Sequence, residues 1–209
     1  MIKTIIVEDN IYMQKHLVNM LAAQADFEIV AALGDAFEAE ALCRGSHVDL
    51  VLMDVQTRHN HSGIAAAQRI KEQSAAKVVV VTSLIDPEVL VKAKTGAADS
   101  LWYKDHGDDE LMQVIRQTLA GEHMFPDTSP SVELKDMFSA DITPRQIEIL
   151  RMFVKGLTYD EIAAELGISK NGVRWNLEQI VEKGGFENKH QLLAAVIENK
   201  LIVTTLKEE

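Results

Sequence analysis

The chain contains very little cysteine, and Cys43 is the single one among 209 residues. One thiol cannot form an internal disulfide framework, and a cysteine-rich zinc site is excluded with it. The first residues, MIKTIIV, run directly into two acids, which is unlike a secretion signal. No stretch approaches the ~20 apolar residues that a membrane-crossing helix needs. We therefore expect a soluble protein of the reducing cytoplasm that makes no membrane contact.

Basic residues are also scarce, because 21 Lys and Arg stand against 32 Asp and Glu, giving a net charge of −11. Nucleic-acid binding depends on Lys and Arg, so the total charge favours an enzyme or a protein-binding module over a DNA-binding protein. Hydrophobic residues make up 47% of the chain and charged residues 25%, which is typical of folded domains. At ~100–200 residues per domain, the length allows one or two domains.

Over residues 1–120, short apolar runs alternate with amphipathic stretches. This alternation predicts an α/β domain with a parallel sheet and helices on both faces. We expect a flavodoxin-like, doubly wound sheet of five strands in the order 2-1-3-4-5. The expected strands are 3–7, 28–32, 48–53, 77–82 and 100–103, and the expected helices lie near 11–24, 35–44, 63–73, 87–95 and 108–120.

The alternation stops over 121–141, a stretch with two prolines and five acids against one lysine. It predicts a linker with one short helical turn around Val132–Phe138. Residues 142–209 then carry helix signals only, including the capping boxes TPRQ from Thr143 and TYDE from Thr158. Four short helices in this part predict a small all-α domain.

Polar residues follow four strands of the predicted sheet. Glu8 and Asp9 follow the first strand, Asp54 the third, Thr82 the fourth and Lys104 the fifth. An acid at one strand end is usually a loop residue or a helix cap, but open parallel sheets bind ligands at this edge, so the coincidence favours a site. Three converging carboxylates repel one another unless a cation lies among them, and Mg²⁺ suits such an oxygen-lined site. The lysine and the hydroxyl would complete a pocket for a phosphoryl group.

The segments that carry these residues are VEDN, VDLVLMDV, VVVVTS and AADSLWYKD, and they resemble the receiver domain of bacterial two-component response regulators. The resemblance covers about residues 1–120. It implies that Asp54 is the phosphoacceptor, a carboxylate nucleophile that takes a phosphoryl group from a histidine kinase. It also implies that Glu8, Asp9 and Asp54 hold Mg²⁺. Thr82 would contact the phosphoryl group and rearrange with it, while Lys104 would pair with it.

Two segments depart from that family's pattern. The loop after the phosphoacceptor reads QTRHNHSG and lacks the usual proline. We expect Arg58 to be a solvated loop residue, and two loop histidines, His59 and His61, seldom bind metal alone. The family's aromatic switch position falls on Leu101, which Trp102 follows. Phosphorylation would therefore be coupled differently, or weakly, to the surface formed by the fourth helix, fifth strand and fifth helix.

The string DITPRQIEILRMFVKGLTYDEIAAELGISKNGVRWNLEQIVEKGG resembles the LuxR-type helix-turn-helix of NarL/FixJ response regulators, over about 141–201. A helix pair with a tight glycine turn is as often an ordinary αα-corner, so the whole string carries the resemblance. It implies that the third helix enters the major groove of DNA. Lys170, Arg174 and Glu178 would share one face, with Arg174 contacting bases or phosphates and Trp175 beside it. An acid at 178 would accept from cytosine, but it also repels phosphate.

Together these features predict a transcription regulator in which phosphorylation controls dimerisation and binding of a homodimer to double-stranded DNA. We expect no enzyme activity beyond its own phosphoryl transfer and dephosphorylation. The alternative is a response regulator that acts by protein contact, or independently of phosphorylation, with weak DNA binding. Residues 1–120 carry a charge of −6, 121–141 carry −4 and 142–209 carry −1. The acidity thus lies mostly outside the helical part, and predicts weak DNA binding by the monomer.

Overall fold

The computed structural model describes residues 1–203. Contacts along the chain divide it into two compact units, one over Met1–Thr128 and one that begins at Ser129. The segment after the last helix of the first unit packs on that unit, because the backbone N–H of Leu101 donates to the carbonyl of Met124 at 2.9 Å. The stretch expected as a linker is therefore shared between the two units. Each unit is described by itself below.

The first unit contains a five-stranded parallel sheet, and its order β2-β1-β3-β4-β5 confirms the flavodoxin-like topology expected from the sequence. β3 is buried throughout and β4 is buried at every residue after Lys77, as expected for strands covered on both faces. The strands are β1 (Ile2–Val7), β2 (Phe27–Leu33), β3 (Leu50–Met53), β4 (Lys77–Thr82) and β5 (Ser100–Tyr103).

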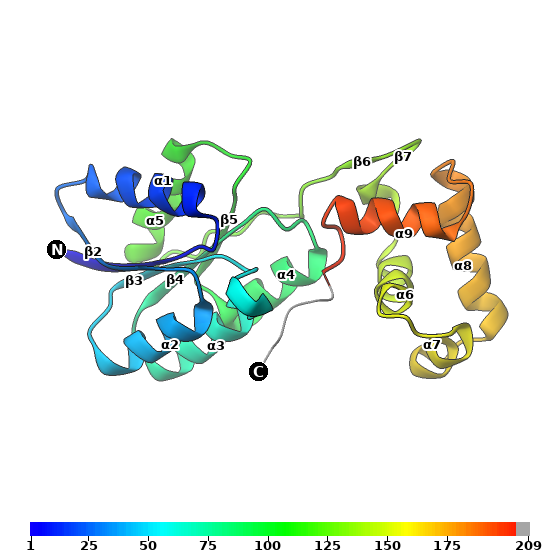
Figure 1. Cartoon of the computed structure of the whole chain (residues 1–209), viewed down its shortest axis with the longest axis horizontal. Coiled ribbons are helices and arrows are strands. Elements are labelled where there is room, and N and C mark those ends of the chain that lie inside the picture. Colours follow the sequence, from blue (N-terminus) through cyan, green and yellow to red (C-terminus); the bar gives the residue numbers. More distant parts are fainter. Residues whose placement is uncertain (204–209) are drawn as a thin grey trace. The chain divides into compact units, whose positions relative to one another are not determined.

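Helices cover both faces of this sheet, as Figure 1 shows. One face carries α1 (Ile11–Ala22) and α5 (Asp108–Leu119), and the other carries α2 (Ala36–Gly45), α3 (Gly63–Gln73) and α4 (Pro87–Lys92). A π-helical turn, η2, continues the last of these over residues 93–97. Side chains at the start of each of four helices accept backbone N–H groups that have no partner within the helix. These caps are Asn10, Asp35, Ser62 and Asp86.

Alternation along the strands divides the core between the two faces. Ile6, Leu52, Val81 and Trp102 belong to one buried cluster with residues of α1 and α5. Their immediate neighbours along the strands, such as Leu101, are equally buried and point to the opposite face. Because all the strands of this sheet are parallel, their carboxyl ends lie at one edge, where the polar residues follow.

The second unit begins with a small β-hairpin, which differs from the helical turn expected around Val132–Phe138. Its strands are β6 (Glu133–Leu134) and β7 (Met137–Phe138), joined by a turn in which Lys135 has φ 61°. Leu134 and Met137 are directly paired and buried. Apolar residues three positions apart fit a helix turn equally well, so the spacing in the sequence could not separate the two structures.

Four helices follow the hairpin and a 3-10 turn, η3 (Ser139–Asp141), and they confirm the expected small helical domain. Both expected capping boxes form, and Gly167, with φ 62°, makes the tight turn between the second and third helices. None of the helices in the described part of the chain is long and apolar enough to span a membrane. The helices are α6 (Pro144–Val154), α7 (Tyr159–Leu166), α8 (Lys170–Lys183) and α9 (Lys189–Glu198).

Candidate functional site

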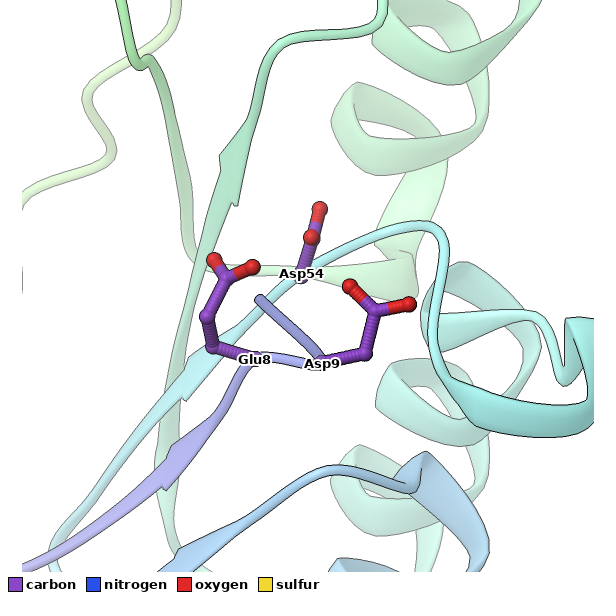
Figure 2. A group of neighbouring side chains, drawn as sticks. All are labelled: Glu8, Asp9 and Asp54. Carbon is purple, nitrogen blue, oxygen red and sulfur yellow. The ribbon is translucent and has the colours of Figure 1, made fainter. Parts of the chain in front are cut away.

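Three carboxyl groups gather where β1 and β3 end, as Figure 2 shows. Glu8 and Asp9 follow β1, and Asp54 follows its neighbour β3. One oxygen from each lies within 4.8 Å of the others. Glu8 and Asp54 are 2% and 7% exposed, whereas Asp9 is open to solvent. The group thus has a buried floor and one side through which a ligand can enter.

Lys104, which follows β5, reaches into this group. Its Nζ lies 2.6 Å from Glu8 Oε2 and 2.8 Å from Asp54 Oδ2, and its side chain is only 11% exposed. The backbone N–H of Lys104 donates to the carbonyl of Thr82 at 2.9 Å, which continues the pairing of β4 with β5. The sheet therefore places the ammonium group between two acids that come from other strands.

Burial and charge act against each other at this cluster. Burial raises the pKa of the Asp54 carboxyl to about 7, with Lys104 opposing and Glu8 adding to the rise. Burial lowers the pKa of Lys104, but the carboxylates of Asp54 and Glu8 outweigh it, so the pKa lies above its usual value. One ammonium group faces three carboxyl groups, and a further cation would relieve their repulsion.

The donor atoms fit a magnesium ion. Magnesium prefers carboxylate oxygens and usually retains several waters, which the exposed side at Asp9 admits. In each buried acid, the oxygen that does not contact Lys104 accepts a backbone hydrogen bond. Asp54 Oδ1 accepts the N–H of Val55 at 2.7 Å, and Glu8 Oε1 accepts the N–H of Asn10 at 3.1 Å. These bonds orient the two buried acids before any ion binds.

Thr82 and the two expected switch residues are all buried. The hydroxyl of Thr82 accepts the N–H of Leu84 at 3.0 Å, which turns the chain at the end of β4. Leu101 is 2% and Trp102 4% exposed, and they point to opposite faces of the sheet. The Trp102 ring nitrogen is buried without a hydrogen-bond partner in the described part of the chain. The structure thus gives the location of these residues, while their switching role stays a prediction.

Gly63 supports the site in a way that the sequence alone did not reveal. A Cβ atom there would overlap the carbonyl oxygen of Asp54, so only glycine permits this close approach at the start of α3. The reappearance of glycine after the unusual loop was the one signal available. Within that loop, buried Thr57 donates to the carbonyl of His61 at 2.9 Å, and His61 Nδ1 lies 2.8 Å from Asp35. These contacts fasten the loop to the start of α2.

The middle of that loop, residues 58–60, is exposed, and the exposure of Arg58 agrees with the expected solvated loop residue. Arg58 and His59 are both solvent-accessible, and the side chain of Arg58 lies over Gly34. The rings of His59 and His61 are 5.8 Å apart. In the described chain, the metal-compatible group of acids and histidines is the one formed by Glu8, Asp9 and Asp54.

The expected DNA-contacting residues lie together on the exposed side of α8. Lys170, Arg174, Trp175 and Glu178 are all solvent-exposed. The inward side is formed by buried side chains at the expected helical spacing. These buried residues are Val173, Leu177 and Ile180.

Two family models match the chain. The response regulator receiver domain matches residues 4–116, more than half of the chain, and the bacterial regulatory proteins of the luxR family match residues 140–196. This protein is a two-component response regulator. Receiver domains generally bind Mg²⁺ and work with a histidine kinase, and LuxR-type domains bind DNA, so the two units of this response regulator have distinct partners.

Similar proteins extend over nearly the whole response regulator. The uncharacterized transcriptional regulatory protein YxjL of Bacillus subtilis is 26% identical over 195 residues, covering 88% of this chain and 89% of that protein. The oxygen regulatory protein NreC of Staphylococcus aureus is 26% identical over 215 residues, covering 96% and 99%. This chain has the order of receiver and LuxR-type domains expected for the NarL/FixJ type.

Solved structures of RcsB show the same fold. RcsB of Salmonella enterica serovar Typhimurium, bound to a promoter with a beryllofluoride phosphomimetic, has a TM-score of 0.62 at 20% identity. A structure of two RcsB dimers on two parallel DNAs has a TM-score of 0.64 at 19% identity. Each covers 94% of this chain and 98% of the RcsB chain.

Proposed function

We propose that this response regulator is phosphorylated on Asp54 by a histidine kinase in a Mg²⁺-dependent reaction. The observation that carries the proposal is the cluster itself: Lys104 lies between Glu8 and Asp54, and Asp9 stands at its open side. Glu8, Asp9 and Asp54 would hold the ion, which would neutralise charge on the transferring phosphoryl group.

The chain's own residues supply the remaining steps. A carboxylate oxygen of Asp54 attacks phosphorus, forming an acyl phosphate as the bond to the histidine nitrogen breaks and the imidazole leaves. Lys104 moves from the free carboxylate to the new phosphoryl oxygens, since both are anions within its reach. Thr82 gives up its bond to the Leu84 N–H when its hydroxyl turns to the phosphoryl group. The receiver catalyses this transfer and the later hydrolysis, and we propose no other enzyme activity.

The second half of the proposal is that phosphorylation controls dimerisation and DNA binding. The RcsB structures support it. One structure contains two RcsB dimers bound to two parallel DNAs, and another contains RcsB bound to a promoter in the presence of a phosphomimetic. In this chain α8 would enter the major groove, with Arg174 contacting bases or phosphates. Such a regulator must reach both DNA and the phosphoryl-donating domain of the kinase, and we therefore place it in the cytoplasm.

Incubation with Mg²⁺ and acetyl phosphate tests the first half. Intact-mass spectrometry should show one added phosphoryl group on the parent chain and none on Asp54→Ala. Omitting Mg²⁺ should abolish the addition as well. A phosphoryl group that persists on Asp54→Ala would contradict the assignment of the acceptor.

A second candidate function is regulation by protein contact, or independently of phosphorylation, with weak DNA binding. It is favoured by the acids beside the cations of α8 and by Leu101 at the family's aromatic switch position. Gel shifts with beryllofluoride-activated protein separate the two functions. Selective binding of a duplex supports transcription regulation, and binding of all duplexes with equal weak affinity supports the second function.

A further inference from the structure

Both cations on the exposed side of α8 already have an anionic partner within the protein. Lys170 Nζ lies 2.6 Å from Asp160 Oδ2, which belongs to α7. Arg174 Nε donates to Glu178 Oε1 at 2.7 Å, one helical turn further along α8. The four side chains are between 49% and 70% exposed, so each pair is open to any anion that approaches the helix.

A third cation on the same surface is also engaged. Lys189, at the start of α9, lies 4.8 Å from the centre of the Tyr159 ring and donates to its hydroxyl. Arg174 chiefly, and Lys189 to a smaller extent, hold the pKa of Glu178 below its usual value. Glu178 of α8 thus lies within the electrostatic reach of Lys189 at the start of α9, and the contacts of Lys170 with Asp160 and of Lys189 with Tyr159 bring α7 to the same surface. On the surface expected to meet DNA, Lys170 and Arg174 are therefore each paired with a carboxylate, and Lys189 contacts an aromatic ring.

Fold stability does not explain these pairs, because ion pairs between solvent-exposed side chains contribute little to it. Their effect on DNA binding is larger in principle. A lysine or arginine that binds a phosphate normally releases a condensed counterion from DNA. Here each phosphate must first replace a carboxylate that remains tethered nearby and repels it. Binding to arbitrary sequence, which rests almost entirely on phosphate contacts, loses the most.

On a DNA site with a suitably placed cytosine, Glu178 can form a hydrogen bond that replaces its contact with Arg174. A carboxylate in the major groove accepts a hydrogen bond from the amino group of cytosine, and such a base contact is sequence-specific. Asp160 is on the preceding helix, α7, which in this fold crosses the DNA backbone and does not read bases. The two acids therefore have different consequences for base preference.

We propose that Asp160 and Glu178 are specificity-determining residues, which occupy Lys170 and Arg174 and so suppress binding to DNA of arbitrary sequence. On a cognate site Glu178 accepts from a cytosine amino group, and Arg174 is released to the DNA. The proposal rests on the DNA-binding function proposed above. It makes the acidity of this surface a source of selectivity.

Selection from a random duplex library tests the proposal, using the full chain activated with Mg²⁺ and beryllofluoride. The affinities of the parent and variants are then measured for the selected duplex and for a random duplex over a salt series. Glu178→Gln and Asp160→Asn each remove one charge without changing side-chain shape. Glu148→Gln is the matched control, since Glu148 forms an exposed pair with Arg145 on α6 at the same 2.7 Å.

Glu178→Gln should bind the random duplex about threefold or more tightly, and its plot of log affinity against log salt should steepen by about 0.9 for one added phosphate contact. It should also lose the preference for cytosine at one position of the selected duplex. Asp160→Asn should tighten random binding and keep that base preference. Glu148→Gln should leave both unchanged.

Equal effects of Glu178→Gln and Glu148→Gln on random DNA would overturn the proposal, because net charge alone would then account for them. Selective binding by the parent in that experiment would leave the proposed DNA-binding function intact. A parent chain that selects no sequence from the library would overturn both. Circular dichroism of each variant confirms that the helices are retained.

Discussion

The receiver site and the α8 surface contain the same kinds of charged groups at the same distances, but they differ in burial. Lys104 lies 2.6 and 2.8 Å from its two acids, and the ion pairs of α8 measure 2.6 and 2.7 Å. Lys104, Glu8 and Asp54 of the receiver site are at most 11% exposed, whereas the four paired side chains on the α8 surface are at least 49% exposed. Because solvent screens exposed charges, removing a buried partner costs far more than removing an exposed one.

The two regions also differ in their balance of charge. The receiver site has three carboxyl groups and one ammonium group, which pairs with two of them, and this leaves the site open to a further cation. On α8 each cation has its own acid, so binding there exchanges one anion for another. The buried receiver site, with more acids than cations, suits chemistry assisted by a metal ion. The exposed α8 surface, where each cation is paired with one acid, suits reversible binding of DNA.

Removing the buried cation should have the largest effect. Lys104→Met leaves Glu8 and Asp54 buried without their partner and should destabilise the receiver by about 3–5 kcal/mol. Urea denaturation followed by Trp102 fluorescence measures this in a Trp175→Phe background, because each unit contains one tryptophan. Lys170→Met, which breaks an exposed pair, is the control and should leave the transition of its own unit, followed by Trp175 in a Trp102→Phe background, almost unchanged. Equal effects would contradict the contrast in burial.

Magnesium should stabilise the receiver alone. An ion present at a hundred times its dissociation constant stabilises the folded state by about 2.7 kcal/mol. The Trp102 transition should therefore shift to higher urea with Mg²⁺ and return with a chelator, and Asp9→Asn should weaken the shift. In a Trp102→Phe background, the Trp175 transition should not move. A magnesium effect on the Trp175 transition would argue against a site confined to Glu8, Asp9 and Asp54.

Gly63→Ala should disturb the receiver through packing. The added methyl group overlaps the Asp54 carbonyl, and overpacking of this kind costs about 1–3 kcal/mol. Phosphoryl uptake from acetyl phosphate should slow as well, because the backbone that carries the acceptor shifts. Gly107→Ala is the control, since a Cβ at Gly107 would meet no atom within 4 Å. Normal uptake by Gly63→Ala would show that the close approach is dispensable.

The smallest of these effects should come from the exposed surface. Arg174→Ala should weaken binding of the selected duplex by a factor of about ten and binding of a random duplex by less, because Glu178 holds Arg174 on DNA of arbitrary sequence. Trp175→Ala should weaken binding less, because its ring offers a thymine methyl one apolar contact. Titration of labelled duplexes measures both. An Arg174→Ala chain with the parent's affinity would show that α8 does not enter the groove as proposed.

Much of the receiver was predictable because short apolar runs, and the polar residues that follow them, are local features of the sequence. The strand order and the meeting of Glu8, Asp9 and Asp54 followed from the strand ends, since neighbouring parallel strands end at one edge. The α8 face followed from spacing, and its pair of Arg174 with Glu178 matches a known i,i+4 contact.

Features that depend on distant parts of the chain could not be predicted. The pair of Lys170 with Asp160 joins two helices whose relative angle no sequence pattern gives. The sequence predicts a helical turn where the structure has the β6–β7 hairpin, because the spacing of Leu134 and Met137 fits both a helical turn and a hairpin. The need for glycine at Gly63 depends on a backbone oxygen nine residues away.

The most direct test of the account is the effect of activation on affinity for a selected duplex. Parent protein with Mg²⁺ and beryllofluoride should bind this duplex about tenfold or more tightly than untreated protein, which is within the usual range of coupling between two sites. Asp54→Ala should bind with the lower affinity under both conditions. If the parent binds equally well with and without beryllofluoride, phosphorylation of Asp54 does not control DNA binding.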